Sequence, residues 1–154
     1  MNDDDLLAPS LADAARPGAR RRPWRLASQF WVAFFGGPLG VATIAWLNAR
    51  RLELDRQARL AIAATGVAGL LVGVALALAL RAADLASGAR LATQAAGVLA
   101  YGILYRIQKP GDRVYAFYGT REEDYDSLLG PGIAAVVGLG IPTVVGLGLV
   151  AEAG

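Results

Sequence analysis

The sequence has no cysteine and no histidine, and it has one methionine, Met1, and one lysine, Lys109. The first two absences exclude disulfides, thiol chemistry, the common zinc sites and imidazole proton transfer. A lone Met and a lone Lys leave little for axial haem ligation or lysine chemistry. The sequence therefore predicts no catalytic residue, cofactor or metal site, and we do not expect an enzyme.

Charged residues are also scarce: they make up 18% of the sequence, against about 25% in soluble domains. Apolar residues make up 55% of the 154 residues, and the mean hydropathy is +0.43. The excess lies in four segments, at about 28–47, 60–80, 91–107 and 130–151. We predict an all-α, polytopic membrane protein, with a polar, Arg-rich tail over 1–25 and a single membrane domain over 26–154.

The first segment is broken at Gly36-Gly37-Pro38, so it is either a kinked span or a re-entrant hairpin. Four full spans would divide the basic residues seven to eight between the two sides, which is no bias. A hairpin with both ends in the cytoplasm would place thirteen of the fifteen on one side, leaving only Arg81 and Arg90 on the other. The positive-inside rule favours the hairpin, whereas most Gly-Pro breaks merely kink a span. Both alternatives stay open.

Glycine and proline mark the expected helix contacts. In segment 60–80, Gly69 and Gly73 form a small-residue stripe with Thr65 and Ala77, at the four-residue spacing that lets helices approach closely. Such a stripe packs within the chain or against a second copy. The predicted helix-packing residues are Gly36, Gly37, Pro38, Gly66, Gly69, Gly73, Gly138 and Pro142.

Aromatic and basic residues lie at the ends of the first segment, where membrane proteins place interfacial anchors. The predicted anchors are Trp24, Trp31, Trp46, Arg50 and Arg51. Between the last two segments lies a polar loop at 108–129, where Lys109-Pro110-Gly111-Asp112 predicts a turn and 113–118 a short extended or interfacial piece. Its carboxylates (Glu122, Glu123, Asp124 and Asp126) lack the spacing of a Ca²⁺ loop, so we interpret them as a solvated acidic cluster.

The stretch Gly36-Gly37-Pro38-Leu39, followed by Asn48 and Arg50-Arg51, resembles a pattern in small uncharacterised bacterial integral membrane proteins. The resemblance covers about residues 30–54 and implies no activity. The bias toward Arg, Ala, Gly and Leu separately suggests a GC-rich bacterial genome. We expect a multi-pass protein of the bacterial cytoplasmic (inner) membrane.

These observations favour two functions over a third, a membrane-embedded enzyme that would use the acidic loop from Asp112 to Asp126 with a metal ion. The first is a non-enzymatic accessory or scaffold subunit, with the lipid bilayer and other membrane subunits or itself as partners, and no nucleic acid. The second is a small oligomeric transporter or channel that uses the broken segments 28–47 and 130–151, since interrupted helices often form binding sites. Against the second, no ionisable residue lies deep in any segment.

Overall fold

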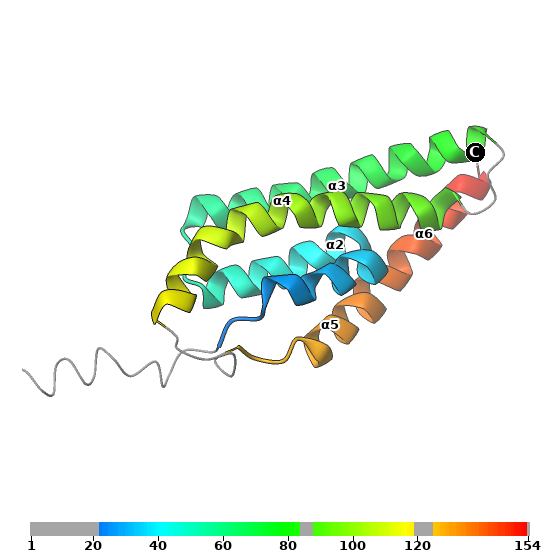
Figure 1. The fold of residues 1–154 in the computed structure, drawn as a ribbon. Helices are drawn as coiled ribbons and strands as arrows, with labels where there is room; N and C mark the ends of the chain where they lie inside the picture. Colours follow the sequence, from blue (N-terminus) through cyan, green and yellow to red (C-terminus); the bar gives the residue numbers. More distant parts are fainter. Residues whose placement is uncertain (1–21, 84–87, 119–124, 154) are drawn as a thin grey trace, which may run out of the picture.

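The computed structural model describes residues 22–83, 88–118 and 125–153. These residues fold almost entirely into helices, which confirms the predicted all-α class (Figure 1). The elements in chain order are η1 (Leu26–Ser28), α2 (Gln29–Arg51), α3 (Arg56–Ala82), α4 (Gly88–Tyr118), α5 (Leu129–Ala135), η3 (Val136–Gly140) and α6 (Ile141–Ala153). Three stretches are long and apolar enough to cross a membrane: Leu26–Arg51, Arg56–Ala82 and Leu129–Gly146. Helix α4 is not among them, because its polar residues lower its hydropathy.

Helix α2 folds back on itself at Gly37, whose backbone angles (φ 65°, ψ −166°) are not helical. Figure 1 shows its two halves, blue and cyan, side by side. Its ends meet, because the side chain of Asn48 hydrogen-bonds the main chain of Trp24. A straight helix would hold residues 24 apart at a distance of about 35 Å. We call residues 29–51 the hairpin and Gly36–Pro38 its tip.

The sequence of the tip accounts for the reversal. A positive φ is costly for any residue with a Cβ atom, and glycine adopts it freely. Pro38 then occupies the first turn of the second half-helix, where its missing N–H has no helical partner to lose and its fixed φ suits a helix. Gly37 and Pro38 thus end one half-helix and start the next.

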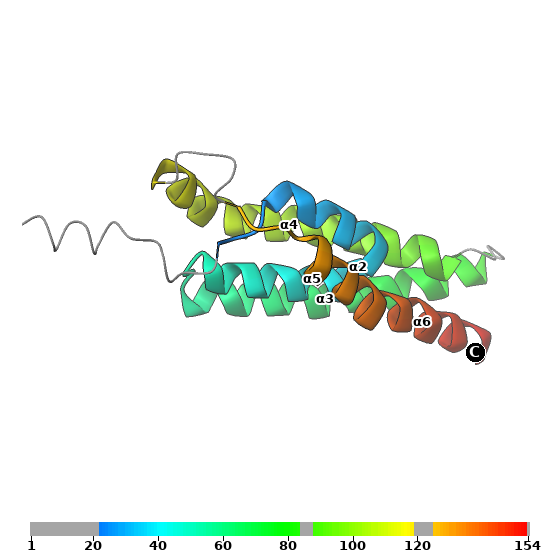
Figure 2. The same ribbon diagram turned by 90° about the horizontal axis from the view of Figure 1, so that it is seen from below.

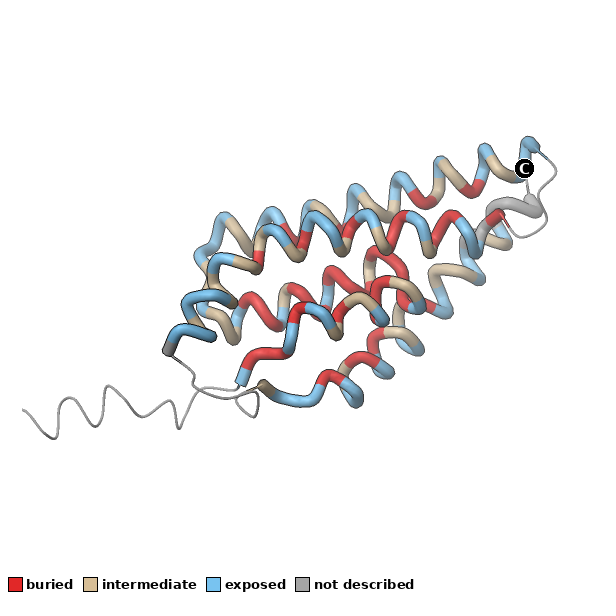
Figure 3. Tube along the Cα trace, viewed as in Figure 1, coloured by how far each residue is buried: buried red, intermediate tan, exposed pale blue. Residues whose placement is uncertain are grey.

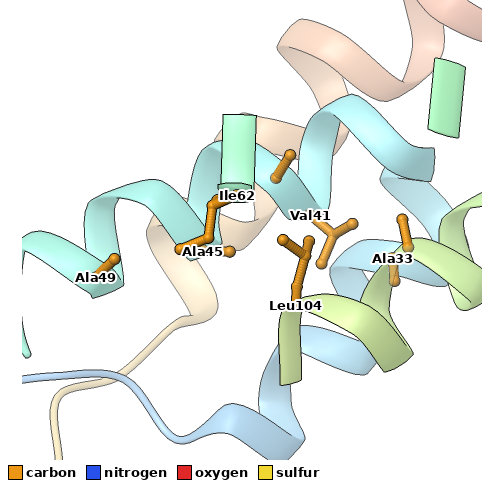
Figure 4. Packing of buried hydrophobic residues seen from close by; sticks show 8 residues of the cluster. Ala33, Val41, Ala45, Ala49, Ile62 and Leu104 are labelled. Carbon is orange, nitrogen blue, oxygen red and sulfur yellow. The ribbon is translucent and has the colours of Figure 1, made fainter. Parts of the chain in front are cut away.

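Helices α3 and α4 form an antiparallel pair along the hairpin, and α5, η3 and α6 cross it from the other side (Figures 1 and 2). Buried residues follow the faces that look toward the hairpin, while the outer faces are exposed (Figure 3). The central cluster joins both halves of the hairpin, through Ala33 and Val41, to Ile62 of α3 and Leu104 of α4 (Figure 4). Most of its members are alanines, which allow the backbones to approach closely.

Helix α4 continues through residues 108–118, so the predicted turn at Lys109-Pro110-Gly111-Asp112 and the extended piece after it are wrong. Tertiary contacts outweigh the local turn signal here. Gly111 packs against Leu54, where a Cβ atom would come within 2.6 Å of the Leu54 Cδ2 atom. The ring of Tyr115 contacts that of Tyr125, with 5.6 Å between centroids. Residues 119–124 of the predicted loop lie outside the described residues.

The last apolar segment is divided by η3, a π-helical turn that ends two residues before Pro142. A proline inside a helix removes one hydrogen bond and crowds the preceding turn, and a wider turn relieves that crowding. The irregularity therefore lies on the N-terminal side of the proline, at Val136–Gly140.

Candidate functional site

Three buried amide side chains close the open end of the hairpin. Asn48 accepts a hydrogen bond from the Trp24 N–H at 2.7 Å, and its Nδ2 atom donates to the Trp24 carbonyl at 3.2 Å and to Gln108 Oε1 at 3.0 Å. Gln108 in turn donates to Gln29 Oε1 at 3.1 Å and to the Leu104 carbonyl at 3.3 Å. The network ties the entry and exit of the hairpin to α4.

The three amide side chains are almost completely buried, so unpaired hydrogen-bonding groups on them would be costly. Gln29, Asn48 and Gln108 are each 1% exposed or less. A buried amide without a partner costs about 1–3 kcal/mol, whereas one whose donors and acceptors are paired costs little and fixes the geometry. Asn48 uses its Oδ1 atom and both Nδ2 protons. The amide network thus specifies which residues stand opposite one another at the end of the hairpin.

Arg51 covers the amide network from outside. Its guanidinium lies over the Trp24 ring, 3.8 Å from the centroid, and pairs with the carboxylate of Asp126 at 3.0 Å. The hydrogen bond from Arg51 holds the pKa of Asp126 below its ordinary value. The main-chain N–H of Asp126 also donates to the Pro23 carbonyl. We call the set of Trp24, Gln29, Asn48, Arg51, Gln108 and Asp126 the polar mouth.

Tyr125 fastens the same segment to α4. Its hydroxyl donates to Asp112 Oδ1 at 3.1 Å, and the Arg25 guanidinium lies 5.7 Å from its ring centroid. Burial raises the pKa of Asp112. Burial and the neighbouring Asp112 carboxylate raise the pKa of Tyr125 to about 12. Asp112 and Tyr125 thus anchor the chain that leads into α5.

At the other end of the hairpin, glycines of three elements surround the tip. A Cβ atom added at Gly69 would lie 2.7 Å from Pro38 Cβ, and one added at Gly66 would lie 2.5 Å from Ala42 Cβ. A Cβ atom at Gly97 would strike the Ala33 carbonyl oxygen, and one at Gly140 would lie 2.6 Å from Gly36 Cα. We call Gly66, Gly69, Gly97 and Gly140 the glycine collar.

Some of the residues predicted to pack helices are buried between helices, and others are exposed. Gly36, Gly37 and Pro38 are buried in the tip. Gly66 and Gly69 belong to the collar, and Gly73 makes an ordinary contact with Ala96 of α4, so this stripe packs within the chain. Gly138 and Pro142 are exposed, and nothing lies within 4 Å of a Cβ atom built on Gly138.

The residues predicted to be interfacial anchors also differ in how far they are buried. Trp24 is 2% exposed and lies beneath Arg51 in the polar mouth. Trp31 is exposed, Trp46 is half-buried against the central cluster, and Arg50 is exposed. Trp24 is buried because the chain before η1 turns inward to bond Asn48, and its position at the membrane interface stays a prediction.

Most of the acidic cluster (Glu122, Glu123 and Asp124) lies outside the described residues. Asp126, its last member, is bound to Arg51 and is not merely solvated. Among the residues that the structure describes, no three Asp or Glu side chains stand close enough together to hold a metal ion.

No family model, curated protein or solved structure matches this chain. Sequence reasoning missed Gln29, Gln108, Gly97 and Gly140. Gln108 carried the one usable signal, because an amide at the end of an apolar helix often bonds a neighbouring helix. Its partners lie 60 and 79 residues away, beyond the reach of local patterns.

Proposed function

We propose that this chain is a multi-pass protein of the bacterial cytoplasmic membrane, and that it serves as a non-enzymatic subunit that assembles with other membrane helices. The apolar outer faces of α3 and of the last segment support a lipid environment. The sequence pattern of α5, η3 and α6 supports the assembly role.

In this proposal the hairpin is re-entrant, with its polar mouth at the cytoplasmic surface. Arg51 at its exit, Arg25 before its entry and Asp126 after α4 meet at this end, while α3 ends with Arg81 at the other. The arrangement agrees with the positive-inside rule. Interrupted backbone inside a membrane must be covered by protein, and the glycine collar supplies that cover.

One observation carries the assembly role: the last segment turns outward a line of four small residues and one proline. The line consists of exposed residues at four-residue spacing, namely Gly130, Ala134, Gly138, Pro142 and Gly146. An exposed apolar ridge runs beside it, formed by Leu129, Ile133, Val137, Ile141, Val145 and Leu149. Membrane helices associate through such small-residue lines, because backbones approach closely along them. We call this line the outer small-residue face.

The test is Gly138→Leu, which fills the outer small-residue face without touching the core. We expect the native assembly, resolved by mild-detergent native electrophoresis of tagged protein, to lose its larger species. Gly102→Leu is the matched control: Gly102 of α4 also has open space beside it, but Val98 and Arg106 stand four residues away on either side. Equal assembly of both variants and wild type would overturn the proposal.

A second candidate function, a small transporter or channel, is favoured by one contact. The two irregular segments meet at their irregular points, since Gly140 of η3 packs on Gly36 of the tip. Interrupted helices that cross in this way form substrate sites in several transporters. Flux of an ion or small solute into liposomes that contain the purified protein, absent in empty liposomes, would favour this function.

A further inference from the structure

Basic residues near the polar mouth fall into two groups. The first group is occupied inside the protein: Arg51 pairs with Asp126, Arg25 lies over Tyr125, and Lys109 lies over Tyr105. The second group is exposed and, within the part of the chain that the structure describes, makes no ion pair or hydrogen bond. It consists of Arg50, Arg56, Arg106 and Arg113. These four exposed guanidiniums are available to an anionic partner.

Arg106 and Arg113 share the outer face of α4. They are seven residues, about two helical turns, apart, Pro110 lies between them, and both are exposed. Val114 and Phe117 are exposed beside them, at 59% and 82%. The opposite side of this stretch is occupied, because Gly111 packs against Leu54. The face therefore combines two free cations with two outward apolar side chains.

The level of this face along α4 follows from the polar mouth. Gln108 bonds Asn48 at the open end of the hairpin, so Arg106 and Arg113 stand on either side of that level. From Gly88, where α4 begins, to Gln108 the helix rises about 30 Å, the thickness of a hydrocarbon core. In the proposed orientation α4, which is less apolar than the other segments, crosses the membrane packed against α3, and residues after Gln108 lie at the height of the lipid headgroups.

We propose that the outer face of α4 from Arg106 to Phe117 binds anionic phospholipid. Each of the two guanidiniums pairs with the phosphate of a lipid headgroup. Arg suits phosphate because its N–H donors form a planar fork. Val114 and Phe117 rest at the boundary with the acyl chains, as in interfacial helices. This inference rests on the proposed membrane orientation and is independent of assembly through the last segment.

The experiment measures lipid retention by the full chain in mild detergent, using native mass spectrometry with equimolar phosphatidylglycerol and phosphatidylcholine. We expect wild type to retain phosphatidylglycerol preferentially. R106Q/R113Q should weaken that retention about five-fold for each arginine removed, at about 1 kcal/mol per cation near a membrane surface.

The matched control is R81Q/R90Q, which removes two arginines at the opposite end of the bundle and should leave the preference unchanged. Phe117→Ser should lower retention of both lipids and leave the preference for phosphatidylglycerol. Equal retention of the two lipids by wild type, or undiminished preference in R106Q/R113Q, would overturn the proposal. Because the readout is lipid bound to single chains, its result does not depend on oligomeric state.

Discussion

Gly140 of η3 lies against Gly36 of the hairpin, so closely that a Cβ atom on Gly140 would stand 2.6 Å from the Gly36 Cα atom and 3.0 Å from the Phe35 carbonyl oxygen. Both neighbours are backbone atoms, which cannot rotate away as a flexible side chain can. The contact therefore requires glycine at position 140. It also brings the tip of the hairpin, where the first segment reverses, into contact with η3, the π-helical turn of the last segment.

The first prediction tests the glycine collar. Gly140→Ala and Gly97→Ala should each destabilise the protein by about 1–3 kcal/mol or more, because the added methyl group meets backbone. The measurement is the thermal midpoint of unfolding in detergent. Gly102→Ala is the control, since its Cβ atom meets open space. Identical midpoints for Gly97→Ala and Gly102→Ala would show that α4 does not press on the tip.

The second prediction concerns Asn48. Asn48→Leu removes the side-chain partner of the Trp24 N–H and of the Trp24 carbonyl, at about 1–3 kcal/mol for each buried group, while Gln108 keeps its bonds to Gln29. With Trp31 and Trp46 replaced by Phe, the emission of Trp24 reports the polar mouth directly. We expect a red shift and faster quenching by iodide. Thr43→Val is the control: it removes only a hydrogen bond within its own half-helix and should change neither the emission nor the quenching of Trp24. An unchanged emission spectrum of Asn48→Leu would refute the role of Asn48 in closing the polar mouth.

The third prediction is a pH dependence with a defined sign. Because the pKa of Asp126 is lowered in the folded protein, its stabilising contribution is present above the ordinary Asp pKa and is lost as pH falls through the lowered value. Asp126→Asn should therefore abolish part of the loss of stability below about pH 4. The pKa of Asp112 is raised, so its contribution has the opposite sign: it is present at low pH and lost as pH rises.

Thermal midpoints measured from pH 3 to pH 7 separate these contributions. Relative to wild type, Asp126→Asn should flatten the acid side of the profile, and Asp112→Asn should steepen it. Parallel profiles for all three proteins would mean that neither carboxylate changes its proton affinity on folding.

The fourth prediction is the topology of the hairpin, tested by single cysteines in a chain that has none. Ala27, Gln57 and Ala83 are exposed positions before the hairpin, after it and at the end of α3. In intact cells, an impermeant thiol reagent should label a cysteine at 83 but neither at 27 nor at 57. Labelling at 57 without labelling at 27 would establish a true first span and rule out the re-entrant hairpin.

Sequence patterns predicted the helices well, because long apolar runs leave few alternatives to helix in this composition. They also located the interruption at Gly36-Gly37-Pro38, but the same triplet suits a kink and a reversal. The contact between Trp24 and Asn48 and the backbone angles of Gly37 distinguish these geometries, and side-chain bonds over such separations leave no local trace. Gly97 illustrates the same limit: its neighbours in sequence are ordinary, and its constraint comes from Ala33 of another element.

The prediction failed most clearly where local chemistry conflicted with packing. Lys109-Pro110-Gly111-Asp112 is a strong turn signal, yet α4 passes through it, because Gly111 fits under Leu54 and Asp112 holds Tyr125. A single sequence contains the residues of these contacts but not their pairing. The residues best predicted were those whose conformation is fixed by their own chemistry, such as Gly37 and Pro38.

The glycine collar also bears on how the chain is made. The hairpin leaves the ribosome before α3, α4 and η3, the three elements that later cover its tip. Neither half is long enough to cross a bilayer by itself, and the freed backbone at Gly37 finds no partner in lipid. The hairpin is thus synthesised before the three elements that cover its tip. In the proposed membrane orientation we expect it to rest at the membrane surface or against the insertion machinery during that interval, and truncation before η3 removes one of the elements that cover its tip.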